Sequence, residues 1–411
     1  MTLFFSVGEP SGDLHGANLI RELRSRPAPA GGWRFVGYGG PRMAAAGAEL
    51  HADLTRLAIM WFARVLLNLH KFLRLAREAE DFFRDHRPDA VVLIDYPGFN
   101  WHIARRAKKH GIPVYYYGTP QLWGWAGWRV KKMRRDVDHP LCKLPFEPEW
   151  FRRRGCEATY VGHPYFDELK SQRLDAEFVE RQRRQPGPLV TILPGSRTQE
   201  VKSNLADQLR AARLVAERVP GVRFAVAGYK ASQAELIEER LARSGLRERG
   251  VAVEVHIGRT PELIHAARCC LAVSGSVSLE LLYHAKPTAI LYRISPLAFW
   301  VQKRFRRVRY ITLVNLLTAT ELFPEHVGVY DPADPQDAHV LMPEYLTCRD
   351  RSADLAAHAV EWLTDDAAHA ERVDRLTTLK ARVANGGASS RAADYLMRTL
   401  AGAVDSSRSA A

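Results

Sequence analysis

Short apolar segments alternate with longer segments of helical spacing along most of this chain. The first half predicts strands at residues 3–7, 34–38, 90–94 and 113–117, and residues 14–24 carry apolar side chains at the spacing of a helix. Alternation of this kind predicts a parallel sheet covered by helices on both faces. Binding and catalytic groups of such folds lie at the carboxyl ends of the strands.

A second alternation of the same kind follows a polar stretch. Residues 170–187 are polar and end in Gln-Pro-Gly-Pro, which is typical of a connection between domains. The strands predicted after it are residues 189–193, 223–227, 251–257, 270–273 and 288–292. We therefore predict an α/β protein of two Rossmann-like domains, residues 1–170 and 187–385, with parallel sheets that face a central cleft.

The composition narrows the class of protein. With 46% hydrophobic and 26% charged residues among 411, the chain has the composition of a soluble globular protein. No apolar run reaches the roughly 18 residues that cross a bilayer, the start does not look like a signal peptide, and the five cysteines form no disulfide framework. We therefore expect a cytoplasmic location. The net charge of +13 favours nucleic acid, anionic lipid or phosphorylated substrates as partners, and a basic solvated surface is the alternative.

The first candidate for chemistry is the turn Gly-Glu-Pro-Ser-Gly-Asp-Leu-His-Gly at residues 8–16. A strand that enters a glycine-containing turn and then a helix presents free backbone N–H groups, but the motif is neither a Walker loop nor the dinucleotide fingerprint. Because Glu9 and Asp13 would repel a phosphate, a sugar hydroxyl is the better ligand. Capping of the helix by Ser11 or Asp13 is the alternative.

Asp95 follows the third predicted strand, in the sequence Ile-Asp-Tyr-Pro-Gly-Phe-Asn at residues 94–100. A carboxylate at the carboxyl end of a strand faces the predicted cleft. There it can act as a general base that removes a proton from an acceptor hydroxyl, a contribution of roughly 10²–10⁴-fold. An Asx bond that only holds the turn is the alternative.

The turn Leu-Pro-Gly-Ser-Arg-Thr-Gln-Glu-Val, at residues 193–201, ends the first strand of the second half. Gly195 and Ser196 permit close approach of the backbone to a ligand. Arg197 can form a forked hydrogen bond to a diphosphate. A surface arginine without a ligand is the alternative.

The turn Ser274-Gly275-Ser276 leads from another strand of the second half into a helix. Small residues at such a position let a pyrophosphate rest on backbone N–H groups. Glu280 lies one helical turn further on, where its carboxylate can accept both ribose hydroxyls of a nucleotide. A capped helix with an exposed glutamate is the alternative.

Two further patterns carry less weight. Asp136 and Asp138 match the DxD that holds a metal in one class of glycosyltransferase, but they lie in a basic stretch before a predicted strand. His163, in Gly-His-Pro, fits a structural role at a turn as well as a role near the cleft. We predict no metal site and no cofactor.

Two segments combine aromatic or aliphatic residues with cations in the way of a membrane-contacting surface. The first is residues 61–73 and the second is residues 300–310. Single-stranded nucleic acid or a core face with a solvated face are the alternatives. The residues that we expect to contact a membrane or acyl chains are Trp61, Phe62, Leu66, Leu69, Trp300, Arg304 and Arg307.

The motifs, taken together, resemble those of the lipid-A-disaccharide synthase family. The match runs in order from about residue 3 to about residue 346. Beyond the four turns already described, the matching segments are residues 39–43, 144–147, 162–164, 292–297, 315–317 and 343–344.

The resemblance implies a GT-B fold and an inverting, metal-independent glycosyl transfer. The donor would be UDP-2,3-diacylglucosamine and the acceptor 2,3-diacylglucosamine 1-phosphate, which give a β-1,6 disaccharide 1-phosphate and UDP in lipid A biosynthesis. It also implies a peripheral enzyme on the cytoplasmic face of the inner membrane, pairing as a dimer, and a C-terminal helix at about 388–402 that packs on the first domain.

The same resemblance assigns roles to residues of the site. Asp95 would be the base, with Glu9 and Asp13 as further catalytic candidates. Gly195, Ser196 and Arg197 would bind the UDP diphosphate together with Ser274, Gly275 and Ser276. Glu280 would hold the ribose. Ser11 and Asn315 would line the cleft.

The chain departs from the family pattern at residues 60–66. The family's Met-Gly-x-x-Glu-Val-Leu is Met-Trp-Phe-Ala-Arg-Val-Leu here, so a glycine is lost and a glutamate is replaced by Arg64. This bears on the acceptor and its acyl chains. Another GT-B enzyme acting on UDP-GlcNAc, an epimerase or a transferase with a different acceptor, is the second hypothesis. A non-catalytic membrane or nucleic-acid binder is the third, and we expect no nucleic-acid partner.

Overall fold

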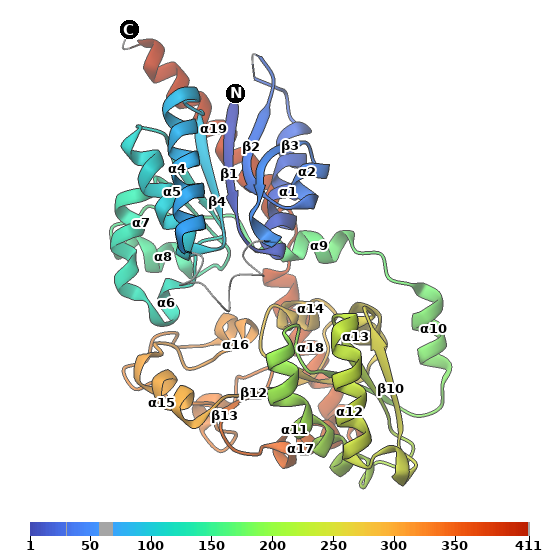
Figure 1. The fold of residues 1–411 in the computed structure, drawn as a ribbon. Coiled ribbons are helices and arrows are strands. Elements are labelled where there is room, and N and C mark those ends of the chain that lie inside the picture. Colours follow the sequence, from blue (N-terminus) through green and yellow to red (C-terminus); the bar gives the residue numbers. More distant parts are fainter. Residues whose placement is uncertain (30, 57–68, 410–411) are drawn as a thin grey trace. The chain divides into compact units, whose positions relative to one another are not determined.

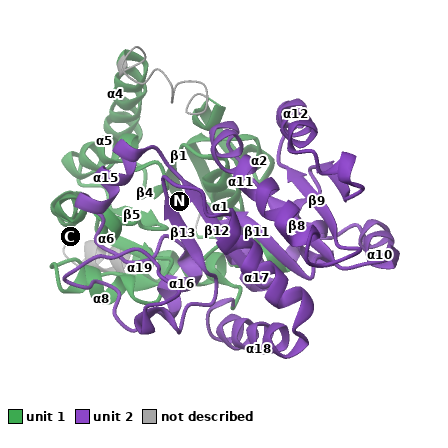
Figure 2. Ribbon diagram, turned by 90° about the horizontal axis from the view of Figure 1, so that it is seen from below, with its two compact units in different colours: residues 1–170, 385–411 green, residues 171–384 purple. Residues whose placement is uncertain are grey.

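The structure, a computed structural model, describes residues 1–29, 31–56 and 69–409. Contacts divide the chain into two compact units, Met1–Lys170 with Asn385–Ala411 and Ser171–Ala384 (Figure 2). Each unit holds one sheet, and every strand pair in both sheets is parallel. The predicted α/β class with two parallel sheets is confirmed. No helix in the described part of the chain is long and apolar enough to cross a membrane.

The sheet of the first unit has the strand order β3-β2-β1-β4-β5-β6-β7. Its strands are β1 Thr2–Val7, β2 Arg34–Gly39, β3 Ala48–Asp53, β4 Ala90–Ile94, β5 Val114–Tyr117, β6 His139–Cys142 and β7 Thr159–Tyr160. The chain leaves β1 toward β2 on one side and later returns to β4 on the other. In such a sheet the crevice that receives a ligand lies at the carboxyl ends of the two central strands, here β1 and β4.

Helices cover both faces of this sheet (Figure 1). They are α1 Pro10–Arg24, α2 Pro41–Ala45, α4 Leu69–His86, α5 Pro97–Lys109, α6 Leu122–Trp125, α7 Val130–Asp136, α8 Glu147–Arg152, α9 Tyr165–Ser171 and α19 Ala388–Ser409. Helix α19 belongs to the first unit because Ala392, Ala393 and Leu396 join the core of β1 and α1. Its amino end is capped by Asp167, which accepts backbone N–H groups of Ala388 at 3.1 Å and Ser389 at 2.8 Å.

The sheet of the second unit has the strand order β10-β9-β8-β11-β12-β13. Its strands are β8 Leu189–Leu193, β9 Arg223–Gly228, β10 Ala252–Ile257, β11 Cys269–Val273, β12 Thr288–Arg293 and β13 Glu344–Thr347. The order reverses between β8 and β11, so the carboxyl ends of these two strands form the corresponding ligand-binding edge.

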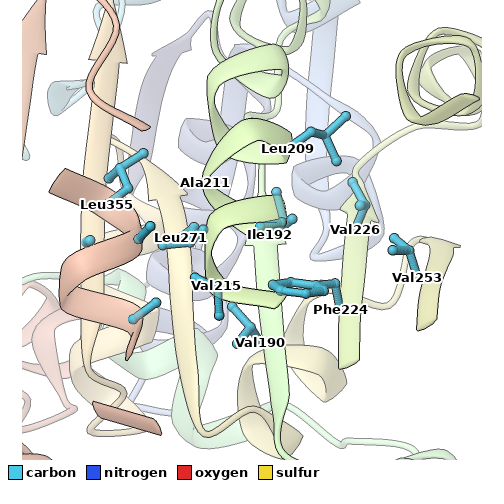
Figure 3. Close-up of a cluster of buried hydrophobic side chains, with 14 of the residues drawn as sticks. Val190, Ile192, Leu209, Ala211, Val215, Phe224, Val226, Val253, Leu271 and Leu355 are labelled. Carbon is cyan, nitrogen blue, oxygen red and sulfur yellow. The ribbon is translucent and has the colours of Figure 1, made fainter. Parts of the chain in front are cut away.

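The core of the second unit lies where α11 and α17 pack on β8, β9 and β11 (Figure 3). Strand residues Val190, Ile192 and Phe224 meet Leu209 of α11 and Leu355 of α17 there, and each fully buried side chain of this kind contributes roughly 1.5–3 kcal/mol. The helices are α10 Ala176–Arg184, α11 Thr198–Ala216, α12 Ala234–Ser244, α13 Thr260–Ala266, α14 Val277–Tyr283, α15 Pro296–Phe305, α16 Leu313–Thr318, α17 Ser352–Thr364 and α18 Asp366–Val383.

The structure differs from the sequence prediction in two places. The polar stretch 170–187 contains α10, whose Phe178 and Val179 are buried, and which packs on α13. Only these two apolar side chains mark it as a packed helix amid charged residues. Strands β3, β7 and β13 were not predicted, because β3 alternates partly buried and exposed residues and the other two have two and four residues.

Candidate active site

Asp95 follows β4 directly, at the predicted crevice of the first unit. Its φ of +48° and that of Tyr96, +42°, lie in the left-handed region, which costs about 1 kcal/mol or more for each such residue. The fully buried Asn100 holds this turn, since its Nδ2 donates to the carbonyl oxygens of Asp95 at 2.7 Å and Ser6 at 3.1 Å. Tyr116 Oη donates to the Asp95 carbonyl at 2.7 Å. The turn is therefore fixed by bonds from three elements.

The side chain of Asp95 is paired with a lysine. Lys143 Nζ lies 3.3 Å from Asp95 Oδ1. Burial alone would lower the pKa of Lys143, but the negative charges of Asp95, Glu147 and Glu9 outweigh it and raise that pKa. Gly118, with φ +76°, leaves room for the lysine stem, since a Cβ there would lie 3.1 Å from Lys143 Cδ. The carboxylate thus has a cation beside it, and among the described residues no Asx bond from this carboxylate to a backbone N–H is found.

A buried carboxylate, Glu147, fixes the loop that carries this lysine. Its Oε2 accepts the backbone N–H groups of Lys143 and Leu144, both at 2.9 Å, and its Oε1 accepts Trp123 Nε1 at 2.9 Å. Burial raises the pKa of Glu147, and these hydrogen bonds oppose that rise. The Leu-Pro-Phe-Glu motif at residues 144–147 therefore positions Lys143.

Two histidines, the buried His15 and the partly buried His163, complete this cluster. Burial lowers the pKa of His15 to about 4, with Lys143 adding to the shift and Asp95 opposing it. Burial, Lys143 and His15 place the pKa of His163 well below its ordinary value. Both imidazoles are neutral at pH 7. His163 Nδ1 accepts the Tyr165 N–H at 3.2 Å, whereas His15 Nδ1 has no hydrogen-bond partner in the described part of the chain.

Asp13 occupies a structural position in this unit. Its carboxylate accepts the backbone N–H groups of Gly40 at 2.9 Å, Arg42 at 3.0 Å and Met43 at 3.0 Å. The capping alternative therefore describes Asp13 well, although the helix that it caps is α2 and not its own helix α1. The carboxylate is therefore engaged with the backbone at the start of α2.

The start of α1 lies close to Asp95. Glu9 is the N-cap residue of α1, and Glu9 and Ser11 are both exposed. A Cβ at Gly12 would lie 3.4 Å from Asp95 Oδ2, so this helix turn and the Asp95 carboxylate are neighbours. The structure thus brings Glu9, Ser11 and Asp95 to one edge of the sheet.

The turn after β8 is pinned through its backbone. Gly195 has φ +119°, and a Cβ there would lie 2.5 Å from Glu200 Cβ, so only glycine leaves room for that side chain. Glu200 Oε2 accepts the Arg197 N–H at 3.1 Å, and Gln233 Nε2 donates to the Ser196 carbonyl at 3.0 Å. The Arg197 side chain itself is 77% exposed. The turn therefore presents an exposed guanidinium, one nitrogen of which, Nη1, lies 3.5 Å from Glu200 Oε1.

The turn after β11 lies beside it, because β8 and β11 are paired. Ser274 Oγ donates to the Ile311 carbonyl at 3.0 Å, which holds the loop. Gly275 and Ser276 are exposed, and a Cβ at Gly275 would meet no atom within 4 Å. Glu280 is buried in α14, in contrast to the exposed position that a simple capped helix would give it.

Asn315, predicted to line the site, is fully buried in α16. Its Nδ2 donates to the Met342 carbonyl at 2.7 Å and to Glu344 Oε2 at 2.9 Å, and its Oδ1 accepts the Met342 N–H at 3.1 Å. Both polar atoms of the amide are used inside the unit. The residue therefore ties α16 to β13.

Comparison with known proteins identifies the family of this chain. Residues 3–355 match the lipid-A-disaccharide synthetase family. The chain belongs to this family. The lipid-A-disaccharide synthase of Alkalilimnicola ehrlichii is 35% identical over 367 residues, which cover 88% of this chain and 93% of that protein. The synthase of Myxococcus xanthus is 34% identical over 320 residues, 78% of this chain and 82% of its own.

Members of this family are glycosyltransferases, and this chain is accordingly an enzyme of that class. The UDP-GlcNAc 2-epimerase of Neisseria meningitidis, solved with UDP-GlcNAc, has a TM-score of 0.61 at 13% identity and covers 97% of this chain and 100% of its own. The calicheamicin glycosyltransferase CalG4 has a TM-score of 0.56 at 16% identity and covers 98% of both chains. These likenesses show the fold alone, and they confirm the predicted GT-B architecture. The epimerase alternative is not favoured.

Both aspartates of the DxD pattern form ion pairs with basic side chains. Asp136 pairs with Arg135 at 2.7 Å, and Asp138 accepts from Lys108 Nζ at 2.6 Å. Among the described residues, no group of three or more His, Cys, Asp or Glu side chains is placed to hold a metal ion.

The second predicted membrane-contacting segment forms α15 and the residues after it. No residue of α15 is buried, and Trp300 is 63% exposed. Arg304 and Arg307 are exposed beside it. Of the first segment, Trp61, Phe62 and Leu66 lie outside the described residues, and Leu69 is the first residue of α4, with a side chain that also lies outside them.

Two groups of residues escaped sequence reasoning. Lys143 was missed because a single lysine after a strand has no motif, and only the pairing of β5 with both β4 and β6 brings it to Asp95. Trp125 and Trp128 are exposed with ring centroids 6.2 Å apart, and the Arg129 guanidinium lies 5.2 Å from the Trp125 ring. Their aromatic spacing is visible in the sequence.

Proposed function

We propose that this enzyme transfers 2,3-diacylglucosamine from UDP-2,3-diacylglucosamine to 2,3-diacylglucosamine 1-phosphate. The products are a β-1,6-linked disaccharide 1-phosphate and UDP. The observation that carries the proposal is the carboxylate of Asp95, held at the carboxyl ends of β1 and β4 beside Lys143, in a chain of this family.

The reaction assigns one task to each group. The acceptor hydroxyl oxygen attacks the anomeric carbon of the donor from the face opposite to UDP, and the bond between that carbon and the diphosphate breaks. Asp95 takes the hydroxyl proton, and Lys143, 3.3 Å away, holds the carboxylate in place. Arg197 offsets the charge that develops on the departing diphosphate. Glu9 lies at the same edge as a further carboxylate for sugar hydroxyls.

The two units divide the substrates in this proposal. Residues 1–170 receive the acceptor and face the membrane, and residues 187–385 bind the UDP-sugar. Backbone N–H groups at Gly195 and Ser196, and at Ser274, Gly275 and Ser276, would meet the diphosphate. Glu280 would hold the ribose, and Ser11 would meet the acceptor. Asp13 and Asn315 act as positioning residues, because their polar atoms are already bonded.

We further propose that the enzyme works as a dimer on the cytoplasmic face of the inner membrane, whose anionic surface attracts α15. Trp300 would enter the interface while Arg304 and Arg307 meet lipid phosphates. Vesicles of phosphatidylcholine with phosphatidylglycerol should bind the protein, and the pair Trp300→Ser and Arg304→Ser should weaken that binding. Equal binding by the variant, or by vesicles of phosphatidylcholine alone, would contradict this role of α15.

Release of UDP from the two acylated substrates, with mass analysis of the lipid product, tests the reaction. We expect a disaccharide 1-phosphate, with one UDP released for each product molecule. Turnover of unacylated UDP-GlcNAc to its epimer, or no UDP release from the acylated pair, would contradict it.

A further inference from the structure

A hollow of about 540 Å³ lies on the second unit at the edge of the sheet opposite to the two turns described above. Its lining includes Leu189 and Arg223, the first residues of β8 and β9. Arg268 and Pro287, which directly precede β11 and β12, also line it. The hollow therefore spans the amino ends of four strands, whereas the predicted UDP site lies at their carboxyl ends.

The groups that line this hollow are strongly cationic. Four of them carry a positive charge, and two more are imidazoles, while no aspartate or glutamate is among the lining residues. The charged groups and the imidazoles are Arg183, Arg223, Arg268, Lys286, His284 and His369.

Neutral oxygens accept hydrogen bonds from two of these cations. Arg223 Nη1 donates to Gln185 Oε1 at 2.8 Å, and Lys286 Nζ donates to the Ala267 carbonyl at 2.7 Å. Two carboxylates outside the lining offset part of the charge: Arg268 pairs with Asp366, whose side chain is 93% exposed, and the charge of Glu254 acts on Arg223. Carbonyls at helix ends carry partial charges of about half a unit per helix, which do not neutralise full charges.

The cations and imidazoles of the hollow also act against one another. Burial lowers the pKa of Lys286, and Arg183 adds to that shift. Burial, His265, Lys286 and Lys380 lower the pKa of His284 to about 4. The Nε2 atom of His284 is buried and has no hydrogen-bond partner in the described part of the chain. An anion in the hollow would offset the positive charge of Lys286 and the neighbouring arginines.

We propose that this hollow binds a phosphate-bearing anion, at a second site separate from the substrates of the transfer reaction. Lys286 and the guanidinium of Arg268 would contact phosphate oxygens, and Arg183, exposed at the rim, would add charge. The volume accommodates a pyrophosphate or a phosphomonoester headgroup. A free phosphate compound and a lipid headgroup share this chemistry.

Calorimetric titration with pyrophosphate tests the site on the full chain, with UDP present at saturation so that the donor site is filled. We expect the double variant Arg183→Gln/Lys286→Gln to bind pyrophosphate about tenfold or more weakly than the wild-type protein. Arg243→Gln with Arg249→Gln, which removes two exposed cations elsewhere on the unit, should leave the affinity unchanged. Because Arg183 is exposed, Arg183→Gln alone should keep the fold and still weaken binding.

A second arm separates the two sources of the phosphate. Vesicles of phosphatidylcholine with phosphatidic acid are bound to wild-type protein and to the Arg183→Gln and Lys286→Gln pair. If the Arg183→Gln/Lys286→Gln variant loses pyrophosphate binding, the ligand is a soluble phosphate compound. If this variant loses vesicle binding and its control does not, the ligand is a lipid headgroup. If neither probe distinguishes the pair from its control, the proposal is overturned, whether or not the enzyme transfers sugars.

Discussion

The carboxyl edges of the two sheets differ in how their charged side chains are held. In the first unit Asp95 sits on strained backbone, with Lys143 at 3.3 Å and Asn100 bonded to its carbonyl. In the second unit the turn is pinned through backbone atoms, while the Arg197 side chain remains largely exposed. The proposed roles fit this difference, since a group that accepts a proton needs a fixed position, whereas a group that binds a diphosphate can become ordered when the ligand arrives.

Glycines make room for the protein's own side chains at both edges. A Cβ at Gly118 would lie 3.1 Å from Lys143 Cδ, and a Cβ at Gly195 would lie 2.5 Å from Glu200 Cβ. A Cβ at Gly275 would meet nothing within 4 Å, so the turn after β11 has open space in front of its backbone.

The largest expected effect is that of Asp95→Asn. Removal of the base should lower kcat by roughly 10²–10⁴-fold, with a small change in KM for the donor. The rate of UDP release under saturating substrates measures it. Asp81→Asn, at an exposed position of α4, serves as the matched control and should retain activity. Near-normal turnover by Asp95→Asn would remove Asp95 from the role of base.

Arg197→Ala should act on binding. Loss of a charge-assisted contact to the diphosphate should raise KM for the donor by roughly tenfold to a hundredfold. Initial rates over a range of donor concentrations measure it, and Arg218→Ala, another exposed arginine of the second unit, is the control. A fall in kcat with unchanged KM would place Arg197 with the chemistry and erase the contrast between the two edges.

Lys143→Met should lower kcat/KM by roughly tenfold, because it removes the cation that lies 3.3 Å from the Asp95 carboxylate. Lys143→Arg keeps the charge and should restore most of the wild-type rate. Initial rates of UDP release measure both variants. Equal losses of rate in the two variants would indicate a purely structural lysine.

The smallest expected effect concerns stability in acid. His15 has a folded-state pKa of about 4, against 6.5 in the unfolded chain. The unfolded state therefore binds more protons in between, and the stability from neutral His15, complete above pH 6.5, is lost as pH falls toward 4, by up to about 3 kcal/mol. Urea unfolding of His15→Gln should show a shallower decline over this window, whereas the exposed His326→Gln should match wild type. An unchanged slope for His15→Gln would contradict the shift.

The sequence was sufficient where a periodic pattern meets a strand end. Strand β4 is apolar throughout and β1 is mostly so, and the ends of these strands, and with them the position of Asp95, follow from the pattern alone. Lys143 lies 48 residues away in sequence, and only the order of the sheet brings it to Asp95. Asp13 shows what a motif does not predict. It lies in a turn that resembles a functional site, but its carboxylate caps α2, the helix that follows β2.

In the proposed function the first unit performs the chemistry and the second unit binds the donor nucleotide. Calorimetric titration of UDP into Asp95→Asn and into Arg197→Ala tests this division of roles. We expect Asp95→Asn to bind UDP with wild-type affinity and Arg197→Ala to bind UDP at least about tenfold more weakly. Weakened UDP binding by Asp95→Asn together with unchanged binding by Arg197→Ala would contradict it.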